Sequence, residues 1–150
     1  MIQCNYDRME DKIKTFGQFG DTGNGGITRF SLSEEAVAAR KEFVKRMEAI
    51  GASVVTDDMA NIYATIPGTE NLPAIYSGSH MDSVRQGGNY DGILGVLTAM
   101  EVAETIVKEN IPHRHPITVM VWTNEEGARF EPAMMLSLIH ISEPTRLQLI

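Results

Sequence analysis

A helical segment between two β-rich runs constrains the fold of this chain more than any other feature. Residues 72–79 (LPAIYSGS) have the composition of a buried strand, residues 92–110 carry apolar residues at helical spacing, and residues 117–122 (ITVMVW) are again β-rich. Upstream, the β-like runs at 53–56 and 61–66 predict a hairpin. A strand, a helix and a strand in this order form an α/β unit, so we expect an α/β fold with a mostly parallel sheet.

Apolar spacing also predicts the buried faces of two helices. Over residues 31–51, Ser31 and Glu34 have the spacing of a capping box, and Gly51 stands where a helix commonly ends. The residues of this helix expected to face the core are Val37, Phe43, Val44, Met47 and Ile50. Those expected to pack from the helix at 92–110 are Leu94, Leu97, Val102, Ile106 and Val107.

Charge and composition narrow the class of partner. The 150 residues carry a formal net charge of −7, and an acidic surface repels the phosphates of nucleic acids. The N-terminal segment lacks the apolar region of a signal peptide, and the apolar stretch at 134–141 is too short to span a bilayer. The single cysteine, Cys4, suits a reducing compartment. We therefore expect a cytoplasmic protein with neither nucleic acid nor a membrane as partner.

A first polar cluster follows the strand predicted at 72–79. His80 and Asp82 lie two residues apart in GSHMDS, so they share a face if the strand continues through them. A metal-binding histidine usually has its other ring nitrogen held by a carboxylate or a carbonyl, and Asp82 is placed to be that partner. Glycines in GGNYDGILG (87–95) place Asp91 at the start of the next helix. A His-x-Asp pair alone is more often a surface pair, and this loop lacks the spacing of a phosphate-binding loop.

A second polar cluster, Asn124-Glu125-Glu126-Gly127, follows the strand predicted at 117–122. Two adjacent carboxylates at the end of an apolar strand are costly to place together unless a cation or a shared proton relieves them. Taken alone, a solvated turn with both carboxylates exposed is the simpler interpretation. Open α/β sheets bind their ligands at the carboxyl ends of their strands, however, and both clusters stand at such ends.

Together these residues predict a site for two metal ions. One histidine and three acids, His80, Asp91, Glu125 and Glu126, come from two strand ends and the loop between them. Oxygen and imidazole ligands suit zinc, manganese or cobalt. Two such ions commonly lie ~3.5–4 Å apart and activate water for hydrolysis. The site needs a bridging ligand, terminal ligands and an unligated base, and these four residues fill those roles in part.

The chain also resembles a known family, the M20-type metallopeptidases and amidases. The resemblance covers nearly all of residues 16–135 and rests on GGITRFSLS (25–33), GSHMDSV (78–84), GGNYDGILGV (87–96) and TNEEGARF (123–130). The GGITR and EGARF flanks favour the hydantoinase/carbamoylase branch, which contains N-carbamoyl-L-amino-acid hydrolases and allantoate amidohydrolases. The resemblance implies a three-layer α/β sandwich.

The resemblance further implies a role for each site residue. His80 is expected to be a terminal ligand of one metal ion, Asp91 to bridge both ions, and Glu126 to be a ligand of the second. Glu125 is expected to be the general base, which passes a proton from water to the leaving nitrogen, while Asp82 orients His80. The expected cofactors are two divalent ions, zinc or else manganese or cobalt. The expected substrates are small molecules with a linear C–N amide bond, N-carbamoyl-L-amino acids or allantoate.

The extent of the chain departs from the family pattern. Family members carry two further histidine ligands and an inserted dimerisation domain, and neither lies in residues 1–135. We therefore expect residues 1–135 to be the N-terminal portion of the catalytic domain of a homodimeric parent enzyme, with no useful turnover by this chain alone. LSLIHISEPTR (136–146) resembles a translated sequencing adapter, so residues 136–150 are expected to be an artefactual tail, with a genuine amphipathic tail as the alternative.

Two other functions stay open at this stage. An aminoacylase or dipeptidase of the M20 type would use the same metal ions on an N-acyl or peptide bond. A non-catalytic remnant is the other alternative, and the presence of His80, Asp91, Glu125 and Glu126 together argues against it. His113 and His115, in a proline-flanked loop, are expected to be solvated rather than ligands.

Overall fold

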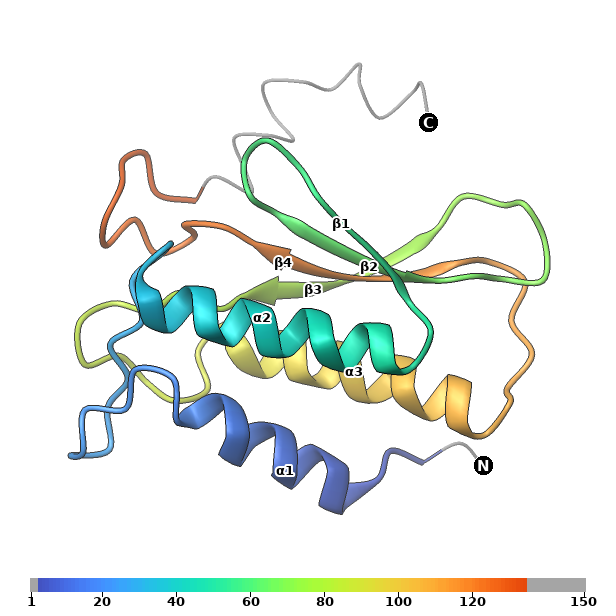
Figure 1. The fold of residues 1–150 in the computed structure, drawn as a ribbon, viewed down its shortest axis with the longest axis horizontal. Helices are drawn as coiled ribbons and strands as arrows, with labels where there is room; N and C mark the ends of the chain where they lie inside the picture. The colour runs from blue at the N-terminus through green and yellow to red at the C-terminus, as the bar shows by residue number, and fades with distance from the viewer. Residues whose placement is uncertain (1–2, 135–150) are drawn as a thin grey trace.

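Residues 3–134 are described by a computed structural model, in which helices cover one face of a four-stranded sheet (Figure 1). The elements in chain order are α1 (Tyr6–Gly17), α2 (Glu34–Ala49), β1 (Ser53–Thr56), β2 (Ile62–Ile66), β3 (Ile75–His80), α3 (Ile93–Lys108) and β4 (Ile117–Trp122). The tail expected at residues 136–150 lies outside the described residues. Within the described part of the chain, no helix is both long and apolar enough to cross a membrane.

The sheet has the strand order β1-β2-β4-β3. The predicted hairpin is confirmed, because β1 and β2 pair antiparallel. The predicted α/β unit is confirmed as well, since β3 and β4 pair parallel and α3 connects them. The sheet is nevertheless mixed rather than mostly parallel, because β2 pairs with β4 antiparallel. The short connection between β1 and β2 reverses the chain there, and no periodicity in the sequence specifies that this hairpin joins β4.

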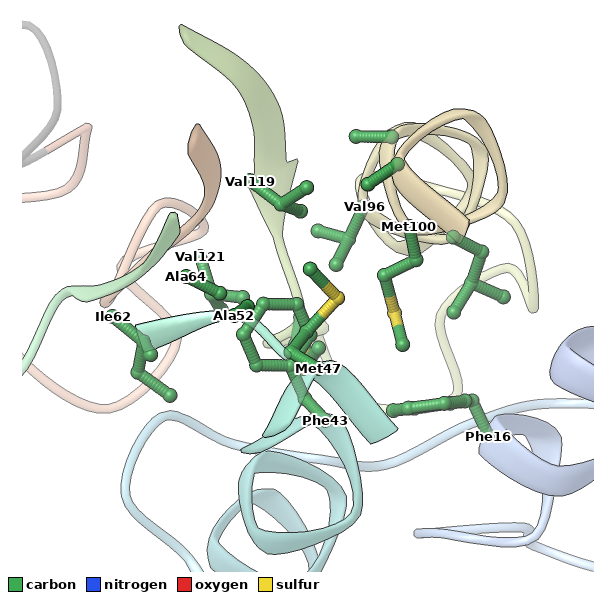
Figure 2. Packing of buried hydrophobic residues seen from close by; sticks show 14 of the residues in the cluster. Phe16, Phe43, Met47, Ala52, Ile62, Ala64, Val96, Met100, Val119 and Val121 are labelled. Carbon is green, nitrogen blue, oxygen red and sulfur yellow. The ribbon is translucent and has the colours of Figure 1, made fainter. Parts of the chain in front are cut away.

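The core lies between the sheet and the two helices that pack on it. α2 contacts β1 and β2, α3 contacts β3 and β4, and α1 packs against α3. Figure 2 shows Phe43 and Met47 of α2 near Val96 and Met100 of α3, with Val119 of β4 above them. All the helices of residues 3–134 lie on the same side of the sheet in Figure 1, so this part of the chain contains two of the three layers expected.

The surface along β3 differs from the prediction. The buried strand expected at 72–79 is instead an edge strand of the described sheet, with Ile75 55% and Tyr76 53% exposed. Leu94 and Val102 of α3, expected to pack inward, are each 40% exposed. The buried residues of α3 are Ile93, Val96, Leu97, Ala99, Met100, Glu101, Ala103 and Thr105. This stripe includes small and polar residues, which apolar spacing alone does not identify as buried.

The ends of α2 are set by two local signals. The N-cap is Ser33, whose hydroxyl accepts the N–H of Ala36 at 3.3 Å, so the capping role expected for Ser31 is wrong. Gly51 follows the helix with φ +87°, and its expected place just beyond the helix end is confirmed. The buried residues of α2 are Ala36, Ala39, Phe43 and Met47. Val37, expected inward, is 38% exposed.

Helix α1 was not predicted from the sequence, although Met9, Ile13 and Phe16 recur at helical spacing and pack in or against the core. Its buried side also contains a charge. The helix begins at Asn5, whose side chain accepts the Arg8 N–H at 2.9 Å. Lys12 is 2% exposed, and its Nζ lies 2.7 Å from a Glu101 oxygen and 2.6 Å from a Glu104 oxygen, both on α3. A buried charge is stable only when it is paired and hydrogen-bonded. Ion pairs therefore contribute to the docking of α1 on α3.

Glu101 is the central acceptor of this cluster. Burial alone would raise its pKa, but hydrogen bonds from Arg8, Lys12 and the Asn5 N–H lower the pKa of Glu101 from 4.5 to about 2. A carboxyl group whose pKa is lower in the folded state stabilises the fold at pH values above its unfolded pKa. That contribution is lost as the pH falls through the folded pKa.

We predict that the free energy of unfolding decreases between about pH 4.5 and pH 2 and that Glu101→Gln removes much of this dependence. At neutral pH the same substitution is expected to cost about 3 kcal/mol, because it leaves the buried Lys12 and the partly buried Arg8 with less negative charge. Urea denaturation of both proteins across this pH range measures the effect.

A matched control is Glu10→Gln, which removes the exposed ion pair of Glu10 with Lys14 on the same helix α1. Little change in stability is expected, because exposed pairs contribute little. An E101Q protein that keeps the acid sensitivity of the wild type would contradict the assignment to Glu101.

Candidate active site

Parallel pairing of β3 with β4 brings the two polar clusters together. His80 is the last residue of β3 and lies opposite Trp122, the last residue of β4. The carboxyl ends of parallel strands meet at one edge of a sheet, so His80 and Asp82 lie next to the segment that contains Glu125 and Glu126. His80 and Asp82 are 7% and 5% exposed, which places the first cluster in a partly desolvated position.

The His80 ring is held in one orientation by its neighbour Asp82. The Nδ1 atom lies 3.0 Å from the Asp82 carbonyl oxygen and 3.7 Å from the Asp82 carboxylate. A carbonyl oxygen accepts hydrogen bonds and cannot donate one, so Nδ1 carries the proton. In the neutral ring Nε2 is then unprotonated, and it lies 3.5 Å from the Glu125 carboxylate. This tautomer presents a nitrogen lone pair toward the second cluster.

Asp82 also binds the main chain of the second cluster. Its carboxylate oxygens accept the backbone N–H groups of Glu125 at 3.3 Å and Glu126 at 3.2 Å. Its carbonyl at the same time accepts the His80 ring. One residue therefore fixes the histidine and both glutamates relative to one another. Sequence spacing contains no signal for this contact, because it joins residues that are 43 and 44 positions apart.

The charges around Glu126 are mostly negative. Burial raises the pKa of this carboxyl, and the nearby charges of Asp91, Glu125 and Asp82 raise it further, while His80 opposes the shift. Asp91 is exposed and directly precedes Gly92, the N-cap of α3, as predicted from the glycine loop. The side chains that the sequence singled out thus lie within electrostatic reach of one another, and a cation at this edge of the sheet would relieve their repulsion.

The chemistry of these donors fits a divalent cation. An unprotonated imidazole nitrogen and several carboxylates are ligands that zinc, manganese and cobalt accept. Gly92 leaves His80 Nε2 open to a ligand because it has no side chain. A Cβ at position 92 would overlap that nitrogen and cover it. In their present positions, no three His, Cys, Asp or Glu side chains of residues 3–134 are close enough together to hold a metal ion.

Several contacts around the second cluster were not expected from the sequence. Asn124 is 1% exposed and has φ +58°, a conformation that asparagine tolerates better than most residues. Its side-chain nitrogen donates to the carbonyls of Phe130 at 2.8 Å and Pro132 at 3.2 Å, so it closes the loop after Glu126. From α2, Arg40 donates to the Thr123 hydroxyl at 3.2 Å. The sequence signal available for this loop was the asparagine itself, a residue type that tolerates positive φ and has an amide to donate.

His113 and His115 are not part of this site. They precede β4, at its amino end, whereas the polar clusters lie at the carboxyl ends of β3 and β4. Each ring is held by a backbone carbonyl, His113 by that of His115 at 2.7 Å and His115 by that of Pro73 at 2.8 Å. Both are partly exposed, which agrees with the expectation that they are loop residues and not ligands.

We predict that Gly92→Ala displaces the His80 ring and destabilises the fold by about 1–3 kcal/mol, because the new methyl group overlaps the ring at a position with φ +65°. The chemical shifts of the His80 ring and a urea denaturation curve report the two effects. Gly88→Ala is the matched control, since a Cβ there meets no atom within 4 Å. Equal behaviour of the two variants would show that Gly92 is not needed to keep the ring in place.

Comparison with known proteins places this geometry in a family. Residues 61–136, which contain both polar clusters, match the model of Peptidase family M28. The chain is 40% identical to an N-carbamoyl-L-amino-acid amidohydrolase of Rhizobium meliloti, over 90% of this chain and 33% of that protein. It is 33% identical to the allantoate amidohydrolase of Escherichia coli, over 87% of this chain and 32% of the relative.

A solved structure agrees with these relatives. The amidase of the hydantoinase/carbamoylase family from Burkholderia multivorans superposes with a TM-score of 0.91 at 34% identity, over 98% of this chain and 36% of that one. The chain thus spans about a third of the length of the curated relatives named above. On this evidence, it belongs to the M28/M20-like hydantoinase/carbamoylase family.

Proposed function

We propose that this chain carries part of the active site of a metal-dependent amidohydrolase, which cleaves the linear C–N amide bond of N-carbamoyl-L-amino acids or allantoate. The observation that carries the proposal is the double role of Asp82, which holds the His80 ring through its carbonyl and the Glu125 and Glu126 backbone through its carboxylate. The relatives named for these two substrates support the substrate class.

The family is generally metal-dependent, and the ions and their number are part of the proposal. His80 through Nε2, Asp91 and Glu126 would hold two divalent cations, zinc or else manganese or cobalt, with Asp91 between them. When bound, such ions supply Lewis-acid polarisation of the amide carbonyl and make water acidic enough to ionise near neutral pH. The crowded carboxylates and the raised pKa of Glu126 support a cation at this position.

Glu125 is the proposed general base. Its side chain is 32% exposed, so it is open to water on one side, while its Oε2 lies 3.5 Å from His80 Nε2 on the other. The Asp82 carboxylate accepts the Glu125 N–H and so fixes the backbone from which this side chain extends. Glu125 would accept the proton of the attacking water at Oε2 and deliver it to the leaving nitrogen, which departs as a neutral amine or ammonia.

The proposal includes partners and location. The substrate is a small molecule, and a net charge of −7 argues against nucleic acid as a partner. We propose a homodimeric parent enzyme in the cytoplasm, a reducing compartment that suits the single cysteine, Cys4. Size-exclusion chromatography with light scattering measures the molar mass of the parent enzyme in solution, which we expect to be that of a dimer.

A chimera tests the proposed activity. Residues 1–134 of this chain replace the matching third of the Rhizobium meliloti relative, with which it shares 40% identity. We expect the chimera to release ammonia from N-carbamoyl-L-amino acids or allantoate, to lose activity with a chelator and to regain it with zinc, manganese or cobalt. Glu125→Gln in this chimera is expected to lower kcat by ~10²–10⁴-fold with its metal content unchanged.

The control for this substitution is Glu70→Gln, which removes an exposed carboxylate paired with Arg114 before the amino end of β3. It is expected to leave kcat unchanged. Full turnover by the E125Q chimera would reject the role of Glu125 as base. A well-folded chimera that hydrolyses dipeptides or N-acyl amino acids and neither proposed substrate would overturn the substrate class.

A further inference from the structure

The GGITR segment contains a buried arginine that the proposed chemistry does not use. Arg29 is 2% exposed, and its guanidinium donates hydrogen bonds to main-chain carbonyls of the described residues. Its Nε donates to the carbonyl of Met81 at 2.6 Å, and its Nη1 donates to the carbonyls of Phe16 and Phe19 at 2.9 Å each. Burial lowers the pKa of Arg29 to about 10, with the charge of Asp82 opposing the shift. A buried cation is costly, so a specific role in this position is expected.

The acceptors of Arg29 belong to two different parts of the fold. Met81 lies between His80 and Asp82, the two residues of the first polar cluster. Phe16 is in the last turn of α1, and Phe19 follows that helix, so both carbonyls belong to the C-terminal end of α1. Arg29 thus ties the segment after β3 to the end of α1. Favourable interaction of a cation with a helix C-terminus adds to these hydrogen bonds.

The backbone around Arg29 is joined to the same segment. The Arg29 N–H donates to the Ser83 hydroxyl at 2.9 Å, and the Ser83 N–H donates to the Arg29 carbonyl at 3.0 Å. Two residues earlier, Ile27 exchanges two backbone hydrogen bonds with Gly87, at 3.0 and 2.8 Å. The motif that distinguishes this branch by sequence therefore runs along the loop from Met81 to Gly87 and holds it on both sides of Asp82.

We infer that Arg29 is a positioning residue for the proposed hydrolysis: its guanidinium fixes the Met81 carbonyl, and thereby sets the Asp82 backbone that orients His80. The inference rests on the proposed function. The role requires the shape of an arginine side chain. A planar guanidinium directs donors from two nitrogens at separate carbonyls, whereas the single ammonium of a lysine cannot reach all of these carbonyls. Arg29 acts through Asp82 and His80 and does not contact substrate.

The test compares Arg29→Met and Arg29→Lys with the wild-type chain. Nitrogen-15 spectra of the His80 ring report its tautomer without any metal, and we expect the Nδ1-protonated form in the wild type and a mixture of tautomers in both variants. Titration with Co²⁺, followed by optical absorption, is expected to show an affinity about 10–100-fold lower in the variants. Substitutions of residues that orient a metal ligand typically have effects of this size. If R29M does not fold, R29K, which keeps the charge, decides the question.

Arg46→Met is the matched control for a purely structural effect. Arg46 joins α2 to α1 through Asp11 at 2.6 Å and the Thr15 hydroxyl at 3.1 Å, away from the polar clusters. It is expected to lower the thermal midpoint and to leave the His80 spectrum unchanged. A folded Arg29 variant with the wild-type tautomer and a Co²⁺ affinity within twofold of wild type would overturn the inference, as would an equal spectral change in R46M. A wild-type chain that binds no Co²⁺ would count against the proposed metal site, while the His80 spectra would still decide the role of Arg29.

Discussion

The parallel pairing of β3 with β4 is the constraint on which the candidate site depends. It places His80 opposite Trp122, so that each strand delivers its polar cluster to the same edge of the sheet. α3 makes this pairing possible, because parallel neighbours need a crossover connection and the helix supplies one. The helix of this crossover has its N-cap at Gly92, so Asp91 lies in the connection, directly before the start of α3. Three separate motifs therefore converge through one topological unit.

The N-terminal third of the described residues supports this unit with charges rather than with apolar area alone. Lys12 of α1 is buried against Glu101 and Glu104 of α3, and Arg29 reaches the segment between β3 and α3. Arg40 of α2 reaches the end of β4 at Thr123. Buried charges and their partners cost desolvation and tolerate little displacement. Together with apolar packing, they fix where the helices lie relative to the strand ends.

Elements with strong periodicity were predictable from the sequence, and contacts between distant residues were not. The hairpin, the helix α3 and the strand β4 follow from local spacing, because each is defined by its own residues. α1 was not predicted although Met9, Ile13 and Phe16 have helical spacing, so local pattern would have identified this helix but not its buried Lys12. The buried stripe of α3 was misplaced because Glu101 and Thr105 are buried while Leu94 and Val102 are exposed. In the site, the residue types and strand ends were predictable. The two-sided contact of Asp82 was not, because no residue pattern encodes a carboxylate that accepts backbone N–H groups 43 and 44 positions away.

The pKa values of carboxyl groups that hold the fold together shift downward, whereas the pKa of a site carboxyl group shifts upward. This contrast distinguishes carboxylates that stabilise the fold from those of the candidate site. Among the described carboxyl groups with a resolved shift, Asp11, Glu35, Glu42, Glu101 and Glu104 have lowered pKa values, caused by basic partners or by hydrogen bonds near a helix start. The pKa of Glu126 is raised instead, by burial and by the surrounding acids. A buried carboxylate without a basic partner destabilises the folded state. Groups with pKa values perturbed in this way concentrate at functional sites. A cation would supply at this edge the positive charge that Lys12, Arg8 and Arg46 supply elsewhere. The chain thus neutralises acids with its own bases where they hold helices together, and it leaves Glu126 with mostly acidic neighbours where two strand ends meet.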